Sequence, residues 1–160
     1  MTARSRGRRL TTSIAMAIAA LAAALAPLSP AHAAYGPDQP VYLGLISNDG
    51  TGLELAVLQG TVAFDDGNTK YRYSLSLCWQ HAYPAPSFLI NVNGTTTNWP
   101  TQTGYSSAPG CSQVYLYNAE VNFGSTVQNV RFDVTGGWFG SNGQYKSRTK
   151  STGTYDNPYN

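Results

Sequence analysis

The strongest constraint on the fold is a strict alternation of apolar and polar residues. It is clearest between Thr69 and Trp79. In this segment Tyr71, Tyr73, Leu75, Leu77 and Trp79 alternate with Arg72, Ser74, Ser76 and Cys78. Successive side chains of a β-strand point to opposite faces, so the segment predicts a strand with one buried and one solvent-facing side. No helical period, which would be about 3.6 residues, occurs after the first 33 residues.

The same criterion predicts about seven strands and therefore an all-β fold. The expected ranges are 41–47, 53–64, 69–79, 87–93, 113–123, 127–139 and 144–152. Bulges are expected at Gly60 and near Asn118, where the long second strand must bend and the apolar phase changes. We expect one antiparallel β-sandwich with immunoglobulin-like or jelly-roll topology over residues 41–152. A short extended lead-in (34–40) precedes it, and a frayed polar tail (153–160) follows.

Residues Met1 to Ala33 predict a cleaved secretory signal peptide. A start with four arginines precedes an Ala/Leu/Ile-rich run from Ile14 to Ala26, and Ala31-His32-Ala33 forms an A-x-A cleavage site. Because roughly 20 apolar residues are needed to span a bilayer, the run is too short for stable membrane anchoring. We therefore expect a secreted, extracellular protein that is cleaved after Ala33. The expected export route is Sec, and the twin arginines Arg8-Arg9 make Tat the alternative route.

Removal of that segment changes the charge. The whole chain has a formal net charge of +2, with ten basic and eight acidic residues. Four of the basic residues and none of the acidic ones precede Ala34, so six basic against eight acidic residues leave −2. A mildly acidic protein has no general attraction for nucleic acid, and no nucleic-acid partner is expected.

Cys78 and Cys111 are the two cysteines of the chain. An even number of cysteines in an exported protein predicts a disulfide bond. Cys78 lies at the end of its strand on the polar face, and Cys111 directly precedes the next long strand. The bond is therefore expected to be peripheral rather than to run through the centre of the sandwich.

The predicted disulfide encloses a long segment without a strand pattern, Gly94 to Gly110, in which Trp99 and Tyr105 lie among Thr, Ser, Gly and Pro. Structureless loops of this length are usually functional or disordered. One interpretation is a binding loop that presents aromatic anchors. The other is that Trp99 tucks under its own loop as a small satellite core.

A second aromatic pair, Trp138 and Phe139, lies in the glycine-rich sequence Gly136 to Gly140. Adjacent strand residues face opposite sides, so one of the two rings is a candidate for exposure. Exposed planar rings suit sugar rings and protein partners alike. The alternative is a bend at the glycines that covers both.

Two charged patterns have ordinary structural explanations. Lys146, Arg148 and Lys150 share one face of the last strand, where they either contact an anionic polymer or protect a sheet edge. Asp65-Asp66 is interpreted as a hairpin turn rather than a calcium site, because no D-x-D-x-D-G loop accompanies it.

Enzyme chemistry has little support. His81 is the sole histidine after the predicted cleavage site, and no G-x-S-x-G or H-E-x-x-H motif is present. No catalytic residue, metal site or cofactor is expected.

The sequence thus predicts a small, secreted, monomeric protein that binds rather than catalyses. The expected ligand-binding residues are Trp99, Tyr105, Trp138 and Phe139. The expected partner is an extracellular polysaccharide or cell-wall glycan. One alternative is a protein-binding role, such as inhibition of an extracellular hydrolase, and a second is a structural surface protein.

Overall fold

The structure is a computed structural model that describes residues 34–80, 84–96 and 99–160, with the side chain of Thr96 excluded. The predicted signal peptide and His81 lie outside the described residues. Every regular element among the described residues is a β-strand, and the described residues form one compact unit.

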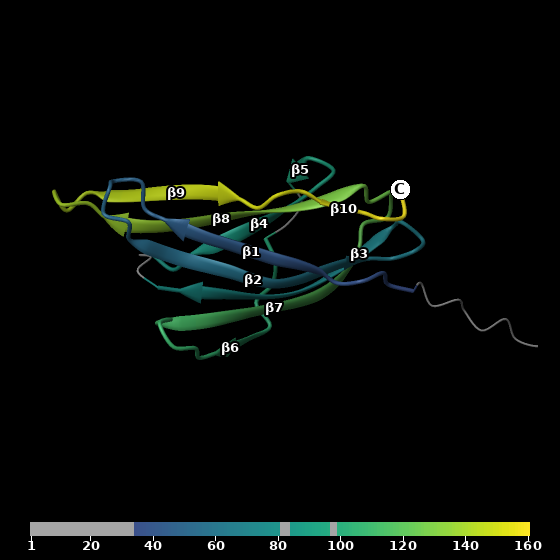
Figure 1. Cartoon of the computed structure of the whole chain (residues 1–160), viewed down its shortest axis with the longest axis horizontal. Helices are drawn as coiled ribbons and strands as arrows, with labels where there is room; N and C mark the ends of the chain where they lie inside the picture. The colour runs from purple at the N-terminus through teal and green to yellow at the C-terminus, as the bar shows by residue number, and fades with distance from the viewer. Residues whose placement is uncertain (1–33, 81–83, 97–98) are drawn as a thin grey trace, which may run out of the picture. The chain divides into compact units, whose positions relative to one another are not determined.

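In the described part of the chain, ten antiparallel strands form two sheets that pack face to face, as predicted for a β-sandwich (Figure 1). The first sheet has the order β1-β2-β3-β7-β6, formed by β1 (Gln39–Ile46), β2 (Glu54–Phe64), β3 (Lys70–Trp79), β7 (Gln113–Asn122) and β6 (Gly104–Ser106). The second has the order β10-β8-β4-β5, formed by β10 (Tyr155–Asp156), β8 (Asn129–Phe139), β4 (Ser87–Val92) and β5 (Thr95–Thr96), and β9 (Tyr145–Ser151) also pairs with β8.

The core lies between the sheets and confirms the alternation seen in the sequence. Tyr71, Tyr73, Leu75 and Leu77 of β3 are buried, whereas the intervening Arg72 and Ser74 are exposed. From the second sheet, Phe88 meets the ring of Tyr117 at 4.8 Å and that of Phe132 at 6.1 Å between centroids, both edge to face. Burial of these rings, together with the aliphatic side chains of the core, holds the two sheets together.

Both predicted bulges are wrong. The pairing of β2 with β3 passes through Gly60, and that of β3 with β7 passes through Asn118, without a shift in register. Gly60 is still required, because its φ is +146° and a Cβ there would lie 2.0 Å from the backbone oxygen of Ser74. The apolar phase of β7 does not change either, because Tyr115 and Tyr117 continue the inward face while Val114 and Leu116 lie on the outer face.

The C-terminal tail does not fray. Its residues Tyr155–Asp156 form β10 against β8. Asn157 is 4% exposed, and its side-chain amide donates to the backbone oxygen of Val127 over 2.7 Å. The tail is therefore part of the sandwich.

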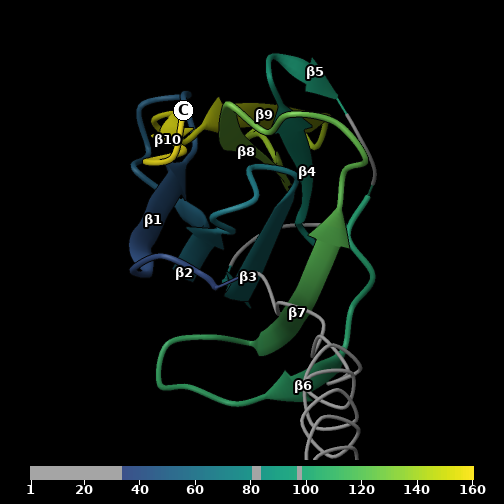
Figure 2. The same cartoon turned by 90° about the vertical axis from the view of Figure 1, so that its right-hand side faces the viewer.

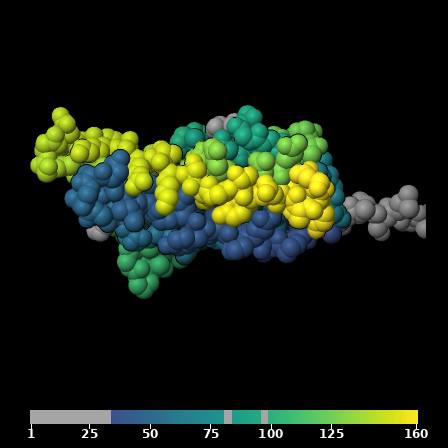
Figure 3. Space-filling model, turned by 45° about the horizontal axis from the view of Figure 1, so that its top comes forward, coloured from purple at the N-terminus to yellow at the C-terminus, as the bar shows by residue number. Residues whose placement is uncertain are grey.

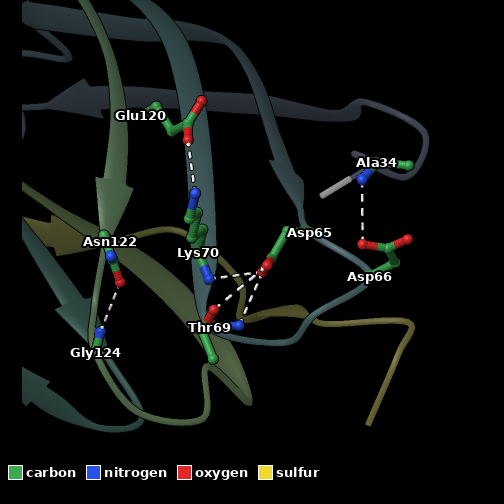
Figure 4. A network of polar contacts seen from close by, with 8 residues as sticks. All are labelled: Ala34, Asp65, Asp66, Thr69, Lys70, Glu120, Asn122 and Gly124. Atoms are coloured by element: carbon green, nitrogen blue, oxygen red, sulfur yellow. Dashed lines mark hydrogen bonds and ion pairs between the residues drawn. The ribbon is translucent and has the colours of Figure 1, made fainter. Parts of the chain in front are cut away.

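The turn between β2 and β3 contains the acidic pair, as predicted (Figure 4). The buried carboxylate of Asp65 accepts hydrogen bonds from the backbone amides of Thr69 (2.8 Å) and Lys70 (2.6 Å). Asp66 accepts one from the backbone nitrogen of Ala34 over 3.1 Å. Both carboxylates therefore fix local backbone, and no group of three or more metal-ligating side chains occurs in the described part of the chain.

Cationic side chains of β9 close one side of the sandwich. Arg148 donates to the backbone oxygen of Ile46 (2.6 Å), and Lys150 donates to that of Gly44 (3.0 Å), both on the outer edge of β1. These contacts give hydrogen-bond partners to carbonyl groups of the edge strand β1. They agree with the interpretation that the cationic row protects a sheet edge. The candidate site lies on the opposite side, between β4 and β7.

Candidate functional site

A groove of about 430 Å³ opens between β4 and β7. Its floor is aromatic and aliphatic, and its rim carries amides and hydroxyls. The lining residues are Tyr71, Tyr73, Ile90, Trp99, Pro100, Thr101, Thr103, Asn118, Ala119, Val121, Asn122 and Phe123. None of these residues carries a formal charge at neutral pH.

The groove lies on the side where the first sheet extends beyond the end of the second sheet. The first sheet continues past β3 through β7 to β6, whereas the second ends at β4 and the two-residue strand β5. In Figures 1 and 2, β6 is far from the strands of the second sheet. Ala119 and Val121 of β7, and Phe123 just after it, pack against the core but remain partly accessible, since no long strand covers them.

The segment after Trp99 crosses from the second sheet to the first and forms the rim. Its end is fixed on β7, because the amide and hydroxyl of Thr103 both donate to the backbone oxygen of Leu116, over 2.8 and 3.0 Å. The side-chain amide of Asn118 in turn donates to the Thr103 hydroxyl over 3.2 Å. The prediction of a structureless segment from Gly94 to Gly110 is therefore wrong, because it contains β5 and β6.

Trp99 is 64% exposed and lines the groove. This position excludes the satellite-core interpretation, in which the ring is covered by its own loop. The hydroxyl of Thr101, which also lines the groove, has no hydrogen-bond partner among the described residues. Asn122 shares the outer face of β7 with Glu120, and its side-chain oxygen accepts from the amide of Gly124 over 3.0 Å (Figure 4).

Tyr105 is 66% exposed and belongs to a row of rings at the other end of β7. It pairs directly with Tyr115 across the sheet and contacts its ring edge to face at 5.7 Å. Tyr115 in turn stacks on Trp79 at 6.3 Å. The row crosses β6, β7 and β3 and holds Tyr105 in a fixed orientation.

Trp138 is buried, with 3% of its surface exposed, and so offers no ring face to a ligand. Its indole nitrogen donates to Asp49 over 2.7 Å. Hydrogen bonds from Thr51 hold the pKa of the Asp49 carboxyl well below its usual range, and those from Trp138 and Ser47 add to this effect. The tryptophan thus anchors the loop between β1 and β2.

Phe139, the neighbour of Trp138, is the exposed ring of that pair, at 55%. It lies at the tip of the β8–β9 hairpin and contacts Tyr145 edge to face at 5.9 Å. The ring of Tyr145 covers Gly137, where a Cβ would lie 2.2 Å from the tyrosine hydroxyl. Figure 3 shows this hairpin reaching beyond the neighbouring strands, and none of its residues lines the groove.

The disulfide between Cys78 and Cys111 is present and peripheral, as predicted. It joins the end of β3 to the residues just before β7, with 5.5 Å between the Cα atoms. The amide of Ser112 also donates to the backbone oxygen of Trp79 over 2.7 Å. The covalent bond therefore fixes the β6–β7 hairpin, which carries Tyr105.

Sequence reasoning missed the floor of the groove. The alternation in the sequence predicts that Tyr71 and Tyr73 are ordinary core residues, and both are buried. Burial also raises the pKa of the Tyr73 hydroxyl above its ordinary value. The available signal is the apolar series Ala119, Val121 and Phe123, at the end of β7, which the second sheet does not cover.

No protein-family model, curated protein or solved structure matches this chain. Within the described ranges, no helix is long and apolar enough to cross a membrane.

Proposed function

We propose that this protein is a secreted, non-catalytic module that binds an extracellular or cell-wall glycan in the groove between β4 and β7. The observation that carries the proposal is the exposed ring of Trp99 at the rim of a groove with an aromatic and aliphatic floor. Trp138, which lies in the core, is not part of this site.

The chemistry of the groove suits a sugar. The apolar CH faces of a sugar ring pack on an aromatic face, and its hydroxyls need fixed donors and acceptors at the edge of that face. Trp99 supplies the face, and Thr101 supplies a hydroxyl that has no hydrogen-bond partner among the described residues. Groups held in place before binding reduce the entropy lost on association.

Secretion is part of the proposal. The disulfide supports it, because such bonds persist in oxidising compartments outside the cytosol. The signal-peptide pattern up to Ala33 supports it independently.

The test is retention of the chain from Ala34 onward on insoluble cellulose, chitin and peptidoglycan. We expect retention on at least one of these polymers, and we expect Trp99→Ala to weaken it by about tenfold, which corresponds to about 1.4 kcal/mol. Phe139→Ala is the matched control, since it removes an exposed ring of similar size outside the groove. Failure of the wild-type protein to bind any glycan, or equal weakening by both variants, would contradict the proposal.

A protein-binding role is the second candidate, and the β8–β9 hairpin favours it. Phe139 and Tyr145 are both exposed on this projecting hairpin and support each other edge to face. Such a hairpin suits insertion into a cleft of a secreted hydrolase. The test is residual activity of a panel of secreted proteases and amylases, in which Phe139→Ala should relieve inhibition and Trp99→Ala should not.

A further inference from the structure

The glycan proposal has a consequence for the length and charge of the ligand. Resting on that proposed function, we infer that the ligand is an uncharged, extended glycan that contacts two separate aromatic platforms, Trp99 at the groove and Tyr105 on the β6–β7 hairpin. The second platform lies outside the groove and forms an additional binding subsite.

The register of β7 places the two platforms on one side of the first sheet. Tyr115 and Val121 are six residues apart on this strand, so their side chains share a face and lie about 20 Å apart. Tyr105 lies directly opposite Tyr115, whereas Val121 lines the groove beside Trp99. One or two sugar rings cannot span this distance, but a longer extended chain can.

The face between the platforms is closed. Tyr117 lies there, is 8% exposed, and packs edge to face on Phe88 of β4. The ligand therefore meets two separate surfaces rather than one continuous aromatic strip. Each platform contributes to binding only when the glycan is long enough to reach it.

The spacing of the platforms is fixed before binding. Thr103, between Trp99 and Tyr105 in the chain, is bound to Leu116 of β7 by two hydrogen bonds. Tyr105 is supported by Tyr115. A fixed spacing allows the second contact to form with little further loss of entropy, so long ligands gain affinity.

The charge pattern points to an uncharged glycan. The groove has no charged lining residue among those described. Glu120 of β7 lies on the opposite face of the strand, where it forms an ion pair with Lys70 over 3.4 Å. A polyanion in the groove would lose hydration without gaining a cationic partner.

The experiment is isothermal titration of the chain from Ala34 onward with cello-, chito- and laminari-oligosaccharides, each from the disaccharide to the hexasaccharide. We expect the hexasaccharide of the preferred series to bind about tenfold more tightly than its disaccharide. Tyr105→Ala should abolish this difference and leave disaccharide affinity unchanged, whereas Trp99→Ala should weaken both ligands. Tyr42→Ala removes an equally exposed tyrosine from β1 and is the control.

The outcomes separate this inference from the proposed function. Affinity that depends on Trp99 but not on chain length or Tyr105 would leave the groove as a glycan site and overturn the second platform. Tighter binding of polygalacturonate than of every neutral series would overturn the uncharged class. Absence of binding to all of these sugars would overturn this inference, and absence of retention on peptidoglycan as well would overturn the proposed function.

Discussion

The disulfide provides the most quantitative prediction. Cys78 and Cys111 are 33 residues apart, so the bond restricts a large loop in the unfolded chain that includes Trp99, Tyr105 and β4. In the chain-entropy description, closure of a loop of this length stabilises the folded state by about 3.7 kcal/mol at room temperature. The double substitution Cys78→Ala and Cys111→Ala should reduce the free energy of unfolding by that amount. For the 127 residues from Ala34 to Asn160, the Tm should fall by about 14 °C.

The assay is urea unfolding followed by tryptophan fluorescence, with oxidised wild-type protein, reduced wild-type protein and the double variant compared side by side. The reduced protein and the double variant should agree within about 1 kcal/mol, because both lack the same constraint. The dependence of the unfolding free energy on urea should also become steeper, since an uncrosslinked chain exposes more surface. A loss of less than about 1 kcal/mol would refute the reasoning and show that the unfolded chain is already compact in this region.

Three further predictions concern edges, ionisation and the chain start. Arg148→Ala should reduce the free energy of unfolding by about 1 kcal/mol, because it leaves a carbonyl of β1 without its donor, whereas Lys146→Ala should change it little. Burial, together with the nearby Glu120 carboxylate, raises the pKa of Tyr35 from 10.0 to about 12. Stability that is present below pH 10.0 is therefore lost as the pH rises toward 12, and Tyr35→Phe should reduce this loss in alkaline urea titrations. In a chain that begins at Ala34, the free amine lies beside the Asp66 carboxylate, so Asp66→Asn should lower stability by roughly 0.2–1 kcal/mol.

Each of these predictions has a contradicting result. Equal effects at positions 146 and 148 would show that the hydrogen bond to β1 contributes nothing. Identical alkaline transitions of wild type and Tyr35→Phe would show that Tyr35 ionises equally in the folded and unfolded chain. If acetylation of the Ala34 amine leaves the effect of Asp66→Asn unchanged, charge pairing at the chain start is absent.

Most of the sandwich could be predicted from local pattern. In β3, side-chain alternation alone distinguishes the buried Tyr71 and Leu77 from the exposed Arg72, because each residue type matches the face it occupies. Two cysteines in a chain that begins with a signal-peptide pattern likewise indicate the disulfide. The short strands β5, β6 and β10 could not be predicted, because two or three residues carry no period and pair only when a neighbouring strand is in place.

The site was predictable only in part. The sequence indicates that Trp138 and Phe139 face opposite ways, but the buried one is decided by a distant partner, Asp49, which accepts the indole hydrogen bond. The sequence identifies Trp99 as a candidate because it lies among Thr, Ser, Gly and Pro in a segment without a strand pattern. The groove beside it was not, since it arises from the different widths of two sheets, which no local segment encodes.

The central claim, that the groove beside Trp99 binds the ligand, is tested most directly by the indole N–H resonances of the three tryptophans. They are recorded on isotopically labelled protein during titration with the oligosaccharide that binds most tightly. The account predicts that the Trp99 resonance shifts with saturation, while that of Trp138, which is buried and bonded to Asp49, stays in place. A shift confined to Trp138, or saturable binding without any change at Trp99, would contradict it.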